Sequence, residues 1–174
     1  MHQHKSAGLA AALFGLSFLL SAQEARISPP ATATVTLNGK EVSIAYSRPS
    51  IRGRKIMGKL VPYGEVWRTG ANEATTLKTA ANLMMGGVKI PAGTYTLYSL
   101  PTENGWKLIV NKQTGQWGTE YDSSQDLARI DLVKSALPAP VEIFTIAFEK
   151  NNVSSAELVL TWELTKLTLP VKAQ

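Results

Sequence analysis

Short runs of alternating apolar and polar residues, each bounded by a turn signal, constrain this chain most strongly. In the first pair of runs, Val35 and Leu37 alternate with threonines, Asn38-Gly39 follows, and Val42 and Ile44 then continue with the same period of two. This period places apolar side chains on one face of a strand, and an Asn-Gly pair favours a tight turn between two strands. These residues therefore predict an antiparallel hairpin.

The C-terminal half repeats this pattern in the runs at 95–100, 106–110 and 144–148. A further run follows at 158–169. In it, Leu158, Leu160, Trp162 and Leu164 share one face, and Leu167 and Leu169 have the other parity. A change of parity within a strand predicts a bulge, here near Thr165. No comparable window has apolar residues at helical spacing. We predict an all-β fold, an antiparallel β-sandwich or jelly-roll-like barrel of roughly eight to ten strands.

One segment, Ser47 to Ala71, departs from the alternation and is rich in glycine and proline. Loops longer than about 12 to 15 residues are uncommon in compact domains and are usually functional or disordered. Apolar residues such as Ile51, Ile56 and Val61 argue against disorder. We therefore predict one long ordered loop that packs onto the sandwich.

The N-terminal residues predict a secretory signal peptide over 1–22. Ala7 to Leu20 is apolar but short for a membrane span, and the small residues Ser21 and Ala22 follow it. This order is typical of a signal peptide cleaved near Ala22. The expected mature chain is one domain over 23–174 without a transmembrane segment, exported to the periplasm or out of the cell.

Removal of this segment restricts the possible chemistry. Both histidines, His2 and His4, lie within it, and the chain has no cysteine. Ser-His-Asp and Cys-His nucleophile systems, the usual zinc sites, haem and iron–sulfur clusters all need those residues. We expect no metal and no cofactor, and any catalysis would depend on carboxylates, Tyr, Lys or Ser.

The positive charge of the chain is concentrated in one place. The formal net charge is +5, and six basic residues between 48 and 68 are opposed there only by Glu65. The six are Arg48, Arg52, Arg54, Lys55, Lys59 and Arg68. No aromatic residues are interleaved in the manner of an RNA-binding surface, so the patch favours a small anion, an acidic glycan or an anionic envelope surface over nucleic acid.

Several blocks of sequence resemble one bacterial family over about Val35 to Pro170. They are "SRPSIRGRKIMGKLVPYGEVWRTGANEATTL", "IPAGTYTLYSLP", "WKLIVNKQTGQWG", "YDSSQDLARI" and "EIFTIAF". Together they identify the chain as similar to the domain of unknown function 2911 family. The resemblance implies an exported, mostly β single domain and implies no reaction, so function has to be argued from the residues.

The long loop and the turn after it carry the candidate binding residues. A guanidinium, an amide and a carboxylate beside aromatic rings are typical of a pocket for a small anionic or polyhydroxy, carbohydrate-like ligand. We predict polar anchors at Arg48, Arg54, Arg68 and Asn72, walls at Tyr63, Trp67 and Trp117, and Glu73 as acceptor or orienting partner of Arg68.

Two other interpretations stay open. Glu73 could act with Asp126 or Glu120 in a carboxylate-based hydrolase or lyase acting on a glycan, which needs two carboxylates across a cleft. The block around Arg68 could instead be a self-satisfied corner of a structural envelope module, and the spacing of Asp126 and Arg129 suits a local ion pair. The absence of His and Cys favours binding over catalysis, and protein partners remain unspecified.

Overall fold

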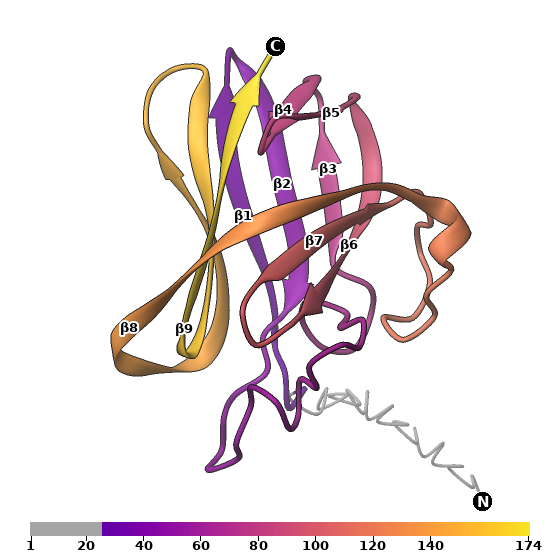
Figure 1. Cartoon of the computed structure of the whole chain (residues 1–174). Coiled ribbons are helices and arrows are strands. Elements are labelled where there is room, and N and C mark those ends of the chain that lie inside the picture. The colour runs from indigo at the N-terminus through magenta and orange to yellow at the C-terminus, as the bar shows by residue number, and fades with distance from the viewer. Residues whose placement is uncertain (1–25) are drawn as a thin grey trace, which may run out of the picture.

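The structure, a computed structural model, describes residues 26–174, so the predicted signal peptide lies outside the described residues. The described chain is almost entirely β (Figure 1). Its strands are β1 (Pro30–Leu37), β2 (Lys40–Ser47), β3 (Thr76–Thr79), β4 (Leu83–Met85), β5 (Val88–Ile90), β6 (Gly93–Pro101), β7 (Trp106–Asn111), β8 (Asp126–Lys150) and β9 (Ser155–Ala173). One 3₁₀ turn, η1 (Ser123–Gln125), precedes β8.

These strands form one antiparallel sheet in the order β1-β2-β3-β6-β7-β8-β9-β4-β5. The sheet is not closed, and it folds over a single core in a sandwich-like arrangement. The nine strands confirm the predicted all-β class and fall within the predicted number. Within residues 26–174, no helix is long and apolar enough to cross a membrane.

The hairpin predicted at Asn38-Gly39 is confirmed. Leu37 pairs with Lys40 across the turn, and both turn residues have positive φ, 49° at Asn38 and 73° at Gly39. Positive φ at both central residues defines the primed turn that matches the twist of two antiparallel strands, and Asn and Gly adopt it at the least cost.

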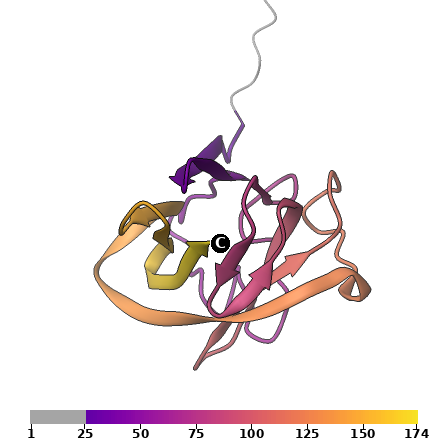
Figure 2. The ribbon, with the colours of Figure 1, turned by 90° about the horizontal axis from the view of Figure 1, so that it is seen from above.

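The long strands β8 and β9 connect the part of the sheet formed by β1, β2, β3, β6 and β7 to the part formed by β4 and β5. The first part of β8, up to Leu132, pairs with β7, and the rest of β8 pairs with β9. Figure 2 shows β8 sweeping around the side of the molecule. The register of the β8–β9 pair is irregular between Ala136 and Thr145, where the long ribbon bends.

The predicted bulge lies close to Thr165. Glu163 has a φ of 52°, and the register of β9 against β8 shifts on both sides of it. Trp162 is therefore buried before the bulge and Leu167 after it, whereas Leu164 is 50% exposed. The prediction is wrong for Leu164, because the chain changes parity one residue before it.

Aromatic rings fill the part of the core that lies next to the long loop. The ring of Trp67 stacks on that of Trp162 at 5.7 Å and meets Phe144 edge-on at 5.0 Å. Trp106 makes a third contact with Trp67, edge-on at 6.3 Å. The loop thus supplies a partly buried aromatic ring that packs against the core, and large aromatic contacts of this kind hold the loop in place.

The loop between β2 and β3, residues 48–75, is ordered as predicted. Ile56 and Val61 are fully buried, and the Glu163 carboxylate accepts hydrogen bonds at 3.4 Å from the N–H groups of Ile56 and Met57. In Figure 1 this loop lies at the opposite end of the molecule from the C-terminus.

Candidate functional site

The turn from Trp67 to Thr75 is a tight corner attached to β6. Trp67 and Ser99 exchange both backbone hydrogen bonds, at 2.8 and 2.9 Å. The Thr69 hydroxyl donates to Ser99 Oγ at 3.0 Å, and the Thr75 hydroxyl donates to the carbonyl of Thr69 at 2.8 Å. These buried hydrogen bonds fix the direction of the chain on both sides of Arg68.

Arg68 lies on the other side of this corner from the core. Successive residues of an extended segment point to opposite faces, so the packing of the Trp67 ring against the core directs Arg68 away from the core. There Arg68 meets Gly118: a Cβ at Gly118 would lie 2.8 Å from Arg68 Cδ and 2.6 Å from the carbonyl oxygen of Asn72. Only glycine permits this approach.

The guanidinium of Arg68 makes no hydrogen bond and no ion pair with the residues between 26 and 174. Its side chain is half-buried and borders a cavity of about 330 Å³, which we name the Arg68 pocket. The residues that line the pocket are Leu60, Pro62, Glu65, Val66, Trp67, Arg68, Tyr98, Gly118, Thr119 and Tyr121. A cation without a partner beside a cavity is available to an anionic group.

Two tyrosines form one wall of the Arg68 pocket. The rings of Tyr98 and Tyr121 meet edge-to-face, with centroids 4.8 Å apart. The Tyr98 hydroxyl donates to the carbonyl of Glu120 at 2.8 Å and accepts from Gln116 Nε2 at 3.1 Å. Tyr98 is only 1% exposed, whereas Tyr121 is half-buried, so the accessible ring surface of this wall comes from Tyr121.

The hydroxyl of Tyr121 belongs to a charged network behind this wall. It donates to Asp126 Oδ2 at 2.7 Å and accepts from Arg129 at 2.9 Å. Burial, and then the hydrogen bond to Asp126, raise the pKa of Tyr121 to about 12. Burial also raises the pKa of Tyr98. Both phenols are therefore neutral at physiological pH.

Asp126, a predicted catalytic candidate, is fully engaged. The predicted ion pair with Arg129 is present at 2.8 Å, and Asn111 Nδ2 donates to the other oxygen at 2.9 Å. The Asp126 side chain is 12% exposed. Glu120, the second candidate, is exposed, and its side chain has no hydrogen-bond partner in the described part of the chain.

Glu73, the third candidate, lies at a different pocket. Arg26 donates to its two oxygens at 2.7 and 2.9 Å, in place of the expected partner Arg68. A hydrogen bond from its own backbone and the hydrogen bond from Arg26 lower the pKa of Glu73. Asn72, predicted as an anchor, donates to the carbonyl of Ser28 at 3.2 Å.

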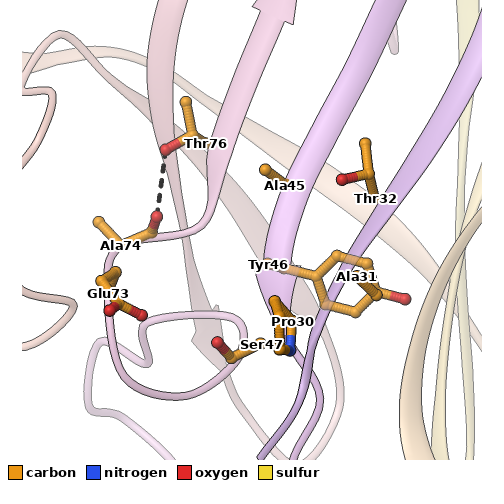
Figure 3. Close-up of a pocket in the computed structure, with 9 residues that line it drawn as sticks. All are labelled: Pro30, Ala31, Thr32, Ala45, Tyr46, Ser47, Glu73, Ala74 and Thr76. Atoms are coloured by element: carbon orange, nitrogen blue, oxygen red, sulfur yellow. Dashed lines mark hydrogen bonds between the residues drawn. The ribbon is translucent and has the colours of Figure 1, made fainter. Parts of the chain in front are cut away.

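Figure 3 shows this second pocket, of about 260 Å³, between the start of the β1–β2 hairpin and the turn that carries Glu73. Besides Glu73, its polar groups include the hydroxyls of Ser47 and Thr76. Asp126 and Glu120 do not line it. Glu73 therefore has different surroundings from the other two candidate carboxylates, and no pair of the three faces across this pocket.

The predicted anchors Arg48 and Arg54 do not line the Arg68 pocket. Arg48 donates to the carbonyl of Phe144 at 3.2 Å and to Thr145 Oγ1 at 2.7 Å. Arg54 donates to the carbonyls of its own loop, Ser50 at 2.7 Å and Ile51 at 3.0 Å. Both guanidinium groups thus hold backbone segments in place.

Of the three predicted wall residues, only Trp67 lines the Arg68 pocket. Trp67 lines the Arg68 pocket although most of its ring contacts lie in the core. Tyr63 packs against Gly58, where a Cβ would approach its ring to 3.0 Å. Trp117 is 46% exposed, and its backbone forms a bridge with Glu73. Neither Tyr63 nor Trp117 lines the pocket.

Sequence reasoning did not assign Glu65, Tyr98, Gly118 or Tyr121 to the binding site. Glu65 and Arg68 are near each other in sequence, but the tyrosines arrive from β6 and from the segment before η1. Local patterns do not show which side chains meet across a sheet. Among residues 26–174, no group of three or more His, Cys, Asp or Glu side chains is placed to hold a metal ion.

Comparison with known protein families matches residues 28–171 to the family described as "Protein of unknown function (DUF2911)". No curated protein matches the chain. No solved structure matches it either.

Proposed function

Because the chain belongs to the DUF2911 family, whose description records no function, we propose from the geometry that it binds a small anionic or polyhydroxy ligand in the Arg68 pocket. The observation that carries this proposal is the guanidinium of Arg68, which has no partner among the described residues and is half-buried at a cavity of about 330 Å³. Guanidinium groups match carboxylate, sulfate and phosphate in geometry and charge. A bound anion would give Arg68 the partner that residues 26–174 do not provide.

The other lining residues suit a sugar-like framework. The ring of Tyr121, which rests edge-to-face on the buried ring of Tyr98, provides an apolar wall for the face of a pyranose or similar ring. Glu65 and Thr119 add a carboxylate and a hydroxyl for ligand hydroxyl groups. An acidic sugar such as a hexuronate combines the features that these groups recognise. Export of the chain, proposed from residues 1–22, would place the pocket among envelope or extracellular molecules.

A thermal-shift screen tests the proposal. The mature protein would be heated with neutral sugars, uronic acids, sulfated glycans, phosphate and dicarboxylates. A ligand at about one hundred times its dissociation constant adds roughly 2.7 kcal/mol to the free energy of unfolding. We expect the anionic or hydroxylated class to raise the melting temperature of the native protein and of Arg54→Ala, but not that of Arg68→Ala.

The two alternatives predict different results, one in this screen and one in an activity assay. If no class shifts the native protein and Arg68→Ala only melts earlier, the corner is structural, as in an envelope module. A carboxylate-based hydrolase or lyase would release products from a glycan and lose that activity in Glu73→Gln. The pairing of Glu73 with Arg26 at another pocket gives this reaction less support than binding has.

A further inference from the structure

We propose that the tip of the long loop, residues 51–60, docks the protein on an anionic lipid membrane surface. This proposal goes beyond ligand binding and rests on different charged residues, although Leu60 at the edge of the tip also lines the Arg68 pocket. Four exposed cations lie on the tip, and its sequence contains no acidic residue. They are Arg52, Arg54, Lys55 and Lys59. In Figure 1 the loop projects past the ends of β1 and β2, so these charges can approach a flat surface.

The tip presents its lysines from a fixed backbone. Ile56, in the middle of the tip, and Val61, directly after it, are fully buried and anchor the tip to the protein. The N–H of Lys59 donates to the carbonyl of Ile56 at 3.1 Å, and the N–H of Gly58 donates to the carbonyl of Val61, just after the tip, at 2.9 Å. Because the backbone is already ordered, docking would not require a flexible loop to be immobilised.

The positive charge of the tip is only partly balanced by its surroundings. Glu142 on β8 and Glu163 on β9 approach the loop, and both accept hydrogen bonds from its backbone N–H groups. None of the four cations forms an ion pair with a residue in the described range. Four cations against two carboxylates leave a net positive tip, which would be attracted to an anionic surface at low ionic strength.

The neighbouring apolar residues favour lipid over nucleic acid. Leu60 is 44% exposed at the edge of the tip. Ile27 is 72% exposed, and its carbonyl accepts a hydrogen bond from Arg52 at 3.2 Å, which places it beside that cation. Cations next to exposed aliphatic groups suit the boundary between headgroups and acyl chains. Single-stranded nucleic acid is bound by stacking on aromatic rings, and the sequence 51–60 contains none.

Vesicle sedimentation tests the proposal. The mature protein would be mixed with vesicles of phosphatidylcholine alone or with added phosphatidylglycerol, over a series of salt concentrations. The test variant is Lys55→Gln with Lys59→Gln, since neither ammonium group has a hydrogen-bond partner among the described residues. The control is Lys89→Gln with Lys172→Gln, which makes the same change of charge on β5 and β9 near the C-terminus.

We expect the native protein to bind only the vesicles that contain phosphatidylglycerol, and binding to weaken as salt is raised. The loop variant should bind about tenfold or more weakly, since each surface cation contributes several-fold to such binding. The control variant should bind like the native protein. Equal binding to both kinds of vesicle, or equal losses in the two variants, would overturn the proposal. So would tighter binding to a single-stranded oligonucleotide than to the anionic vesicles.

Discussion

At the scale of single residues, the candidate site depends on the close approach between Gly118 and Arg68. The N–H of Gly118 donates to the carbonyl of Asn72 at 3.0 Å, so the backbone after Trp117 is joined to the turn after Arg68. The Arg68 side chain passes directly over Gly118 on its way to the pocket. Packing at this one position therefore affects both the corner and the shape of the pocket.

Gly118→Ala should destabilise the protein by about 1–3 kcal/mol, because the added methyl group would overlap a backbone oxygen that cannot move freely. Urea denaturation would measure the change in the free energy of unfolding. Gly105→Ala is the matched control, since a Cβ there comes no nearer than 3.8 Å to Thr102 Oγ1. A Gly118→Ala protein as stable as Gly105→Ala would contradict the packing described here.

Glu73 gives a prediction about pH. Its pKa is lower in the folded protein than in an unfolded chain, so ionised Glu73 stabilises the fold above its unfolded pKa, and this stabilisation is lost as pH falls through the folded pKa. Glu73→Gln should therefore melt below the native protein at neutral pH, and the difference should disappear in acid. Melting temperatures of both proteins across this range test the prediction. A difference that stays constant into acid would show that the charge of Glu73 is not the cause.

Only part of the site could be predicted from its residues. Of the predicted residues, Arg68 and Trp67 both line the Arg68 pocket, and they are neighbours in the sequence VWRTG. The partner of Glu73 could not be predicted, because Arg26 is 47 residues away and meets it only in the folded chain. The place of Tyr98 in the pocket could not be predicted either, because sheet pairing brings its strand to the pocket.

At the scale of secondary structure elements, parity controls which side chains reach the core. The β1–β2 hairpin and the parity change in β9 follow from local sequence, because turn residues and period are local properties. The position of a bulge to a single residue depends on the partner strand, which explains the wrong prediction for Leu164. Strands as short as β4 and β5 contain too few residues to show a period.

The bulge at Glu163 predicts a large effect of substitution at one leucine of β9 and almost none at another. Leu167 is 3% exposed, so Leu167→Ala should cost about 2–5 kcal/mol of folding free energy. Leu164 is 50% exposed, so Leu164→Ser should change stability by no more than about 0.5 kcal/mol. Chemical denaturation of the two variants compares them directly. A larger loss in Leu164→Ser would place the parity change elsewhere.

At the scale of the whole molecule, one end of the sandwich carries both proposed functions. Leu60 belongs to the exposed tip and also lines the Arg68 pocket, so the two surfaces adjoin. The sheet supplies the framework, and the long loop between β2 and β3 supplies the charge. A protein docked through this tip would hold the pocket close to the membrane surface.

The most direct test of the central claim is a nuclear magnetic resonance titration of the nitrogen-labelled mature protein with glucuronate, which carries both a carboxylate and hydroxyl groups. The side-chain Nε–Hε signal of Arg68 would be assigned by its absence in Arg68→Ala. Our account predicts that this signal and the ring signals of Tyr98 and Tyr121 shift together as glucuronate is added, while the Arg54 signal stays in place. Shifts confined to Arg48 and Arg54, with Arg68 unchanged, would contradict it.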